Sequence, residues 1–168
     1  MKEKIVTVKS EFVDYKGITH NFIVAAVSTE VDTAIDIYDG EGNMVDYAEA
    51  TKAVKIGVAV CNPLDKYDEE KGKMIAICKA RNSSNYALYA TLPGMINTAV
   101  VNALISQEVA FIKNNPDRVI PGYNEEKIKY MKRAELNKAI ESLTDEEKAY
   151  YYAVKNNLYP KVKALLEA

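Results

Sequence analysis

The chain has 168 residues, and the 48% that are hydrophobic are enough to build one compact core, which excludes a disordered chain. Its 22 lysines and arginines nearly balance 24 aspartates and glutamates, so the net charge of -2 excludes the global positive field that attracts a nucleic-acid polymer. No apolar run is long enough to span a bilayer, and the charged start lacks the core of a signal peptide. We therefore expect a cytoplasmic protein without membrane association.

Two β-rich runs open the chain, over residues 5–13 and 18–28. Gly17 lies between them and suits the left-handed position of a turn, so the pattern predicts a β-hairpin. A further short strand is expected over residues 33–38. The loop that follows, residues 39–43, holds two glycines and is typical of a surface connection.

The clearest strand pattern covers residues 52–61. Its alternation places bulky Val54, Ile56 and Val58 on one face. The small residues Ala53, Gly57, Ala59 and Cys61 lie on the opposite face. A face without bulk allows a helix, a second subunit or a ligand to approach the backbone closely.

Two helices are predicted next. The first begins after Asp68, whose side chain can cap it, and ends near residues 79–81; Gly72 within it costs about 1 kcal/mol relative to alanine, which indicates a close packing contact. The second is capped by Asn97 or Thr98 and ends near Asn114. Its apolar stripe is wider than burial against one sheet requires, so we expect at least a homodimer.

From Asn124 onward the composition changes to charged, alanine-rich helix. Thr144 and Glu147 have the spacing of a capping box. The order of elements predicts an α+β fold in which two helices pack on a small antiparallel sheet, followed by an added helical segment. We expect a ligand-binding domain over residues 1–123 and a C-terminal helical extension over residues 124–168.

The usual catalytic and metal-binding motifs are missing from the sequence. It has no phosphate-binding, dinucleotide-binding or esterase glycine motif, and the loop that begins at Asp39 has Met44 where a calcium loop needs glycine. His20 has no identifiable nucleophile partner and is expected to face solvent or to be bonded locally. Cys61 and Cys78 lack zinc-ligand spacing and are expected to be buried free thiols. We therefore expect no metal, no cofactor and no enzymatic activity.

What remains is recognition chemistry, centred on residues 86–98. This segment predicts a short strand, a Pro-Gly turn and a capped helix start, and a helix N-terminus attracts phosphates. The candidate ligand-binding residues are Tyr86 and Tyr89 for stacking, Thr91, Asn97 and Thr98 for ribose and phosphate oxygens, and Lys79, Arg81 and Arg118 for charge neutralisation. The alternative is that Asn97 and Thr98 only cap their helix and that Tyr89 only fills the core.

Four stretches together resemble the phage Thoeris anti-defence type I family. They are Phe12-Val13-Asp14-Tyr15-Lys16-Gly17; Ile56-Gly57-Val58-Ala59-Val60-Cys61-Asn62-Pro63 with Asp68-Glu69-Glu70-Lys71-Gly72-Lys73; Leu88-Tyr89-Ala90-Thr91-Leu92-Pro93-Gly94-Met95-Ile96-Asn97-Thr98; and Asn115-Pro116-Asp117-Arg118. The resemblance covers about residues 4–123. The helical extension is longer than this family leads one to expect.

The resemblance implies a sponge, a non-enzymatic phage protein that binds cyclic ADP-ribose isomers made by a host TIR protein and so keeps the downstream effector inactive. It also implies pockets at a dimer interface, and assembly into a hexamer with separate sites for cyclic oligonucleotides. Two other functions stay open. One is a small nucleotide-processing enzyme that uses acids such as Asp14 or Asp68, and the other is a phage structural or assembly protein without a small-molecule ligand.

Overall fold

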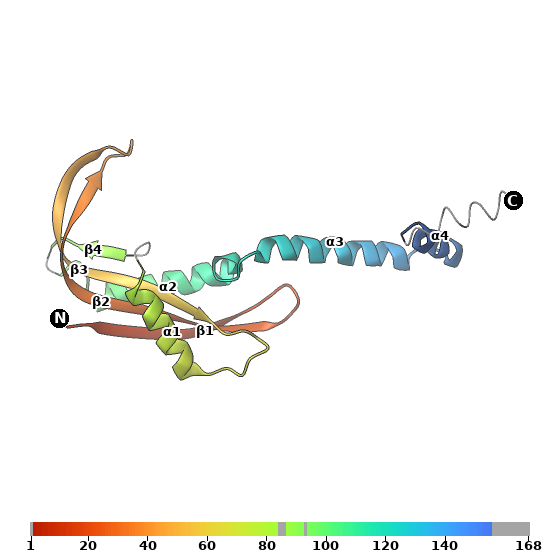
Figure 1. The fold of residues 1–168 in the computed structure, drawn as a ribbon, viewed down its shortest axis with the longest axis horizontal. Helices are drawn as coiled ribbons and strands as arrows, with labels where there is room; N and C mark the ends of the chain where they lie inside the picture. The colour runs from red at the N-terminus through yellow and green to blue at the C-terminus, as the bar shows by residue number, and fades with distance from the viewer. Residues whose placement is uncertain (1, 84–86, 93, 156–168) are drawn as a thin grey trace. The chain divides into compact units, whose positions relative to one another are not determined.

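The computed structural model describes residues 2–83, 87–92 and 94–155, and it confirms the α+β fold (Figure 1). Four strands form one antiparallel sheet in the order β1-β2-β3-β4. The elements of the first compact unit, Met1–Pro121, are β1 (Lys4–Val13), β2 (Thr19–Tyr38), β3 (Met44–Val60), α1 (Glu69–Arg81), β4 (Ala87–Ala90), α2 (Thr98–Asn114) and the 3-10 helix η1 (Pro116–Arg118). The second unit, Gly122–Ala168, contains α3 (Tyr123–Glu141) and α4 (Asp145–Lys155).

The two helices of the first unit cover opposite faces of the sheet. Alternate residues of a strand point to opposite sides, so even-numbered residues of β2 such as Phe22 and Val24 pack with Ile105 of α2. Odd-numbered residues such as Ile23 pack with Ala76 of α1. The sheet therefore has a core on each side, and the inner parts of β2 and β3 are buried between two helical layers.

The small face of β3 is where α1 approaches, as its residue pattern allowed. A Cβ atom placed on Gly57 would overlap the Ala76 carbonyl oxygen and the Ala80 amide nitrogen, and would lie 2.9 Å from Ala80 Cα. The predicted contact at Gly72 is also confirmed, because a Cβ there would lie 2.8 Å from Cδ1 of Ile23. Glycine at these two positions lets the helix backbone lie directly on the sheet.

The predicted turns and caps are confirmed. Gly17 has a φ of 79° in the β1–β2 turn. The side chain of Asp68 accepts a hydrogen bond from Lys71 N, and Asn97, as the N-cap of α2, accepts one from Val100 N at 3.0 Å. These bonds satisfy backbone donors that a helix start otherwise leaves unpaired. In the second unit, Thr144 Oγ1 accepts a hydrogen bond from Glu147 N at 3.3 Å.

Three expectations need correction. The short strand expected over residues 33–38 is not separate, because β2 continues through a register shift between Glu30 and Thr33 as a single 20-residue strand. β3 likewise begins at Met44, well before residue 52, since its first half pairs with the end of β2. The cysteines are free, as expected, but Cys61 is only half-buried and Cys78 is exposed. Their apolar neighbours in sequence therefore did not indicate burial.

The apolar stripe of α2 divides between covered and uncovered residues. Val101, Ile105 and Ile112 are buried, whereas the Phe111 side chain is 45% exposed. A homodimer through this stripe stays a prediction. Within the residues that the structure describes, none of the helices combines the length and the apolar character needed to cross a lipid bilayer.

Candidate functional site

The last part of β3 has an open edge. β4 pairs only with residues 52–55 of β3, whereas residues 56–60 pair with β2 on one side and with no strand of the described chain on the other. A pocket of about 480 Å³ lies at this edge; its lining residues are Ile56, Gly57, Val58, Val60, Lys79, Ser83, Glu108, Arg118 and Val119. We call it the edge pocket. Unpaired strand backbone can donate and accept hydrogen bonds there.

Two cations from different elements converge on the edge pocket. Lys79 lies in the last turn of α1, which the contact at Gly57 holds against β3. Arg118 ends η1, whose start is fixed by Pro116 directly after α2. The tertiary structure thus brings together two of the cations that the sequence nominated, although 39 positions separate them.

Arg118 is held in place by a carboxylate and an aromatic ring. Its Nε and Nη2 atoms donate to Glu108 Oε1 at 3.3 and 3.1 Å, and its guanidinium carbon lies 5.3 Å from the centroid of the Phe111 ring. A bonded and stacked guanidinium is well ordered before any ligand arrives. Among the described residues, Lys79 has no carboxylate partner within ion-pair distance, so the pocket has two cations against one acid.

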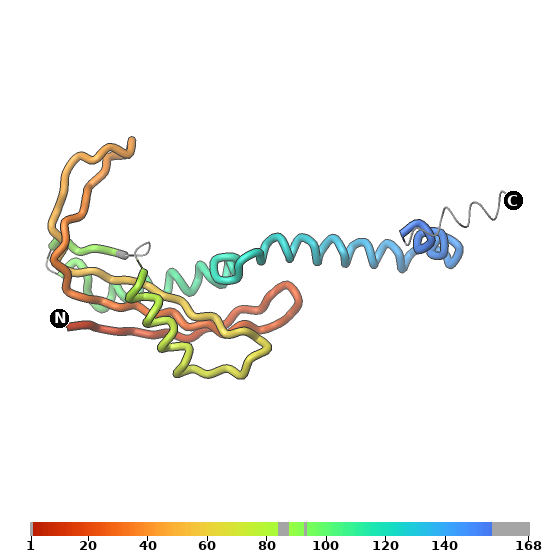
Figure 2. The backbone as a smooth tube through the Cα atoms, in the orientation of Figure 1, coloured from red at the N-terminus to blue at the C-terminus, as the bar shows by residue number. Residues whose placement is uncertain are grey.

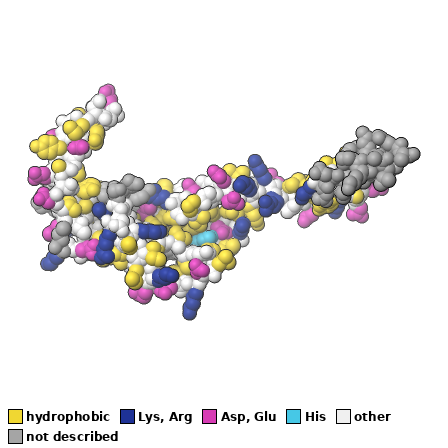
Figure 3. All heavy atoms as spheres, viewed as in Figure 1, with side chains coloured by type: hydrophobic (Ala, Val, Ile, Leu, Met, Phe, Trp, Pro, Cys, Tyr) yellow, Lys and Arg dark blue, Asp and Glu magenta, His cyan; other side chains and the backbone are white. Residues whose placement is uncertain are grey.

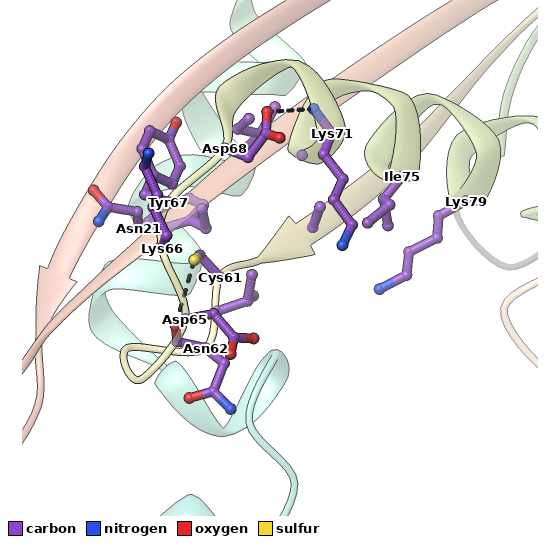
Figure 4. A pocket seen from close by; sticks show the side chains of 15 residues that line it. Asn21, Cys61, Asn62, Asp65, Lys66, Tyr67, Asp68, Lys71, Ile75 and Lys79 are labelled. Carbon is purple, nitrogen blue, oxygen red and sulfur yellow. Dashed lines mark hydrogen bonds between the residues drawn. The ribbon is translucent and has the colours of Figure 1, made fainter.

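A second, smaller pocket adjoins the edge pocket and shares Val60 and Lys79 with it. It has a volume of about 180 Å³ and lies between α1, the start of β2 and the end of β3; we call it the α1 pocket. Figure 4 shows Lys71, Ile75 and Lys79 projecting from one face of α1, as a spacing of four residues requires. The loop before α1 adds Asp65, Lys66 and Tyr67, and Asn21 and Asn62 add amide groups.

The other nominated residues lie outside these two pockets. Asn97 caps α2, and Thr98 Oγ1 accepts a hydrogen bond from Lys4 Nζ at 3.0 Å. Thr91 Oγ1 lies 3.8 Å from Met95 Sδ. Tyr89 is half-buried on β4, opposite Ala53 of β3. These residues surround the start of α2 at the opposite end of the sheet from Arg118, and Tyr86 lies outside the described residues.

Arg81 is engaged elsewhere. Its Nε and Nη2 atoms donate to the two carboxylate oxygens of Glu3 at 2.9 and 2.7 Å. These hydrogen bonds lower the pKa of the Glu3 carboxyl and raise the pKa of Arg81. The nominated residues therefore form two groups, Lys79 with Arg118 and the β4–α2 segment, and Arg81 belongs to neither.

Some pocket residues were missed by sequence reasoning. Lys71 shares a helix face with Lys79, and this eight-residue spacing was a usable signal. Tyr67 and Lys66 lie in a loop between a strand and a helix, where binding residues are commonly found. Glu108 gave no signal, because only the fold places it beside Arg118.

The sole histidine belongs to a buried structural cluster. His20 Nε2 lies 2.8 Å from Asp14 Oδ2, and the His20 ring stacks on Phe12 with ring centroids 4.9 Å apart. Burial raises the pKa of the Asp14 carboxyl, but hydrogen bonds from His20, Ile18 N and Lys16 N outweigh it and leave the pKa below its ordinary value. The expectation of a locally bonded histidine is confirmed.

The two acids considered for an enzyme have different structural roles. Asp14 holds His20, whereas Asp68 caps α1 and lines the α1 pocket. Within the described part of the chain, no group of three or more His, Cys, Asp or Glu side chains is arranged to hold a metal ion. Comparison with protein-family models, with curated proteins and with solved structures finds no match to this chain.

Proposed function

We propose that the chain binds a small phosphorylated nucleotide at the edge pocket and holds it unchanged, so that it sequesters a cyclic ADP-ribose-type immune signal and blocks Thoeris defence. The observation that carries the proposal is the convergence of Lys79 and Arg118 on one pocket beside unpaired strand backbone. A diphosphate requires more than one cation, and these two come from separate, well-fixed elements.

The size and lining of the pocket support such a ligand. Its volume of about 480 Å³ lies within the roughly 300–1,000 Å³ typical of small-molecule sites. Ile56, Val58 and Val60 offer an apolar wall for a base or ribose, and Ser83 offers a hydroxyl. The adjoining α1 pocket supplies the Tyr67 ring and two further lysines, Lys66 and Lys71.

Sequestration requires that the ligand is bound and later released intact. The test is to incubate the full chain with a cyclic ADP-ribose isomer, remove the excess by gel filtration, heat the protein and analyse the supernatant by chromatography. Recovery of the unchanged isomer supports the proposal. Recovery of an altered nucleotide supports the nucleotide-processing enzyme, and recovery of no nucleotide contradicts binding of this isomer and favours the assembly protein.

The site is tested with matched lysine variants. We expect Lys79→Ala to reduce retention of the isomer at least tenfold, because it removes the cation of the edge pocket that no carboxylate neutralises among the described residues. Lys113→Ala is the control, since Lys113 is also exposed in the last turn of a helix but lies away from the edge pocket. Equal retention by both variants would contradict the edge pocket as the site.

The β4–α2 segment is tested in the same assay. If Asn97→Ala or Tyr89→Ala abolishes retention and Lys79→Ala does not, the ligand binds at the start of α2. Circular dichroism of each variant shows whether the loss is due to unfolding, because removal of the Asn97 cap costs about 1 kcal/mol of stability.

A further inference from the structure

The β2–β3 hairpin extends beyond the rest of the sheet. β1 pairs with β2 only as far as Ser28, and β4 pairs with β3 only from Lys52 to Lys55. Within the described part of the chain, residues 31–50 therefore pair only with one another, and Figures 1 and 2 show them as a two-stranded ribbon that curves away from the sheet. We call these residues the arm. A two-stranded hairpin without a covering layer is marginally stable in water.

The arm exposes large apolar side chains. Ile37, Tyr38, Met44, Val45 and Tyr47 are between 41% and 67% exposed. Hydrophobic side chains are visible along the arm in the space-filling view of Figure 3. The register places Tyr38, Met44 and Tyr47 on one face of the arm, together with Asp36 and Glu49, and Ile37 on the other face. Exposed apolar side chains grouped on one face are typical of a surface that contacts another macromolecule.

The arm is also strongly acidic. Its 20 residues contain no lysine or arginine and six acids, which are Asp32, Asp36, Asp39, Glu41, Asp46 and Glu49. The other 148 residues carry 22 cationic side chains and 18 acidic ones. A partner for the arm must therefore offer positive charge together with apolar side chains.

The helix α3 has that character. Its residues 127–138 contain one acid, Glu135, and five cations, which are Lys127, Lys129, Lys132, Arg133 and Lys138. Ile128 and Met131 are 54% and 46% exposed and lie three residues apart, on one face of the helix. This segment of α3 therefore carries positive charge and exposed apolar side chains together, which are the two properties that a partner of the arm needs. A second copy of the chain supplies this surface of α3 and also carries an arm of its own.

We propose that the arm of one protomer binds the basic face of α3 in a second copy of the chain. Asp36 and Glu49 then face the lysines of α3, and Tyr38, Met44 and Tyr47 on the same face of the arm cover Ile128 and Met131. The exchange is reciprocal in a twofold dimer, because each copy carries both surfaces. The proposal does not depend on ligand binding, since neither surface includes a residue of the edge pocket.

The test measures the mass of the full chain by sedimentation equilibrium at low and high salt. We expect an oligomer at low salt that dissociates at about 1 M salt, where exposed charges are screened beyond about 3 Å. The arm variant Asp36→Lys with Glu49→Lys, and the α3 variant Lys127→Glu with Lys132→Glu, should each raise the dissociation constant at least tenfold. Mixing these two variants should restore association through the reversed charge pairs.

Lys148→Glu with Lys155→Glu is the matched control, because it makes the same charge change in α4 and should leave the mass unchanged. Circular dichroism should be unchanged for all variants, since every substituted side chain is exposed except that of Lys148, which is only half-buried. A monomeric wild-type chain at low salt, wild-type mass in either charge-reversal variant, or failure of the mixed variants to associate would each overturn the proposal. A monomer that still retains the nucleotide would overturn only this contact, and Lys79→Ala should keep the wild-type mass.

Discussion

The inner and outer halves of the β2–β3 hairpin are both antiparallel ribbons, but they differ in what covers them. In the inner half, Phe22, Ile23 and Val24 are at most 1% exposed because α2 covers one face and α1 the other. In the outer half, the same two strands stay paired through two register shifts, yet Tyr38 and Tyr47 are 59% and 67% exposed. Strand pairing is therefore a local property, whereas burial depends on the helices that return to the sheet.

The two turns of the sheet repeat this difference. Asp14 Oδ1 accepts hydrogen bonds from Lys16 N and Ile18 N, and Asp39 Oδ1 accepts them from Glu41 N and Asn43 N at matching positions. Gly17 and Gly42 have left-handed φ values of 79° and 85°. Only Asp14 has an additional buried partner, His20. The two turns therefore have the same backbone hydrogen bonds, but the β1–β2 turn is also held by His20, whereas the turn at the tip of the arm lacks such a buried partner among the described residues.

The largest expected effect comes from Gly57→Ala in the inner half. The added methyl group would overlap backbone atoms of Ala76 and Ala80, and backbone cannot move aside as a side-chain end can. We expect a loss of at least about 3 kcal/mol in the free energy of unfolding, measured by urea denaturation.

Gly72→Ala is the control for this substitution. Its methyl group would meet only the flexible end of Ile23, and alanine favours the helix, so stability should change by no more than about 1 kcal/mol. Similar losses for the two variants would show that α1 is not held by its contact with β3.

An intermediate effect is expected from a matched pair of isoleucines. Ile105→Ala empties a site that is 2% exposed beneath α2 and should cost about 2–5 kcal/mol. Ile37→Ala truncates a side chain of the arm that is 41% exposed, and it should cost less than about 1 kcal/mol in the monomer. Thermal unfolding at low protein concentration measures both, and a large cost at Ile37 would indicate that the arm is covered even in a single chain.

The smallest expected effect distinguishes the two turns by pH. The folded-state pKa of Asp14 lies below its ordinary value of 3.8, so the unfolded chain binds more protons in acid. The contribution of Asp14 is therefore fully present well above pH 3.8 and is lost as the pH falls through the lower folded-state pKa. Asp14→Asn should cost about 1 kcal/mol at pH 7, and this difference should vanish at low pH.

Asp39→Asn provides the comparison for Asp14. Backbone hydrogen bonds, of which that from Asn43 N is the strongest, lower the pKa of Asp39, but its carboxylate is exposed. The substitution should therefore reduce stability less than Asp14→Asn does at pH 7. An equal or larger loss of stability in Asp39→Asn would show that the hydrogen bond to His20 does not make the β1–β2 turn the more important one.

Much of the local structure could be predicted from single residues. Asp68 and Asn97 marked two helix starts, Gly17 marked a turn, and the small face of the strand at Gly57 indicated a close approach. The candidate site was predicted only in part. Lys79 and Arg118 do meet, but the sequence grouped them with Asn97 and Thr98, which lie at the other end of the sheet. Spacing along a chain cannot indicate which end of a sheet a helix leads to.

The sequence by itself determined where the strands turn, where the helices begin and which strand face a helix can approach, because these properties depend on neighbouring residues and on the conformational freedom of glycine. Only the tertiary structure decided that Lys79 and Arg118 share an open strand edge, that Asp14 holds His20, and that the arm lies beyond the helical layers. Those arrangements depend on how α1 and α2 pack on the two faces of the sheet. This packing consists of contacts between residues far apart in the chain, which no local sequence pattern specifies.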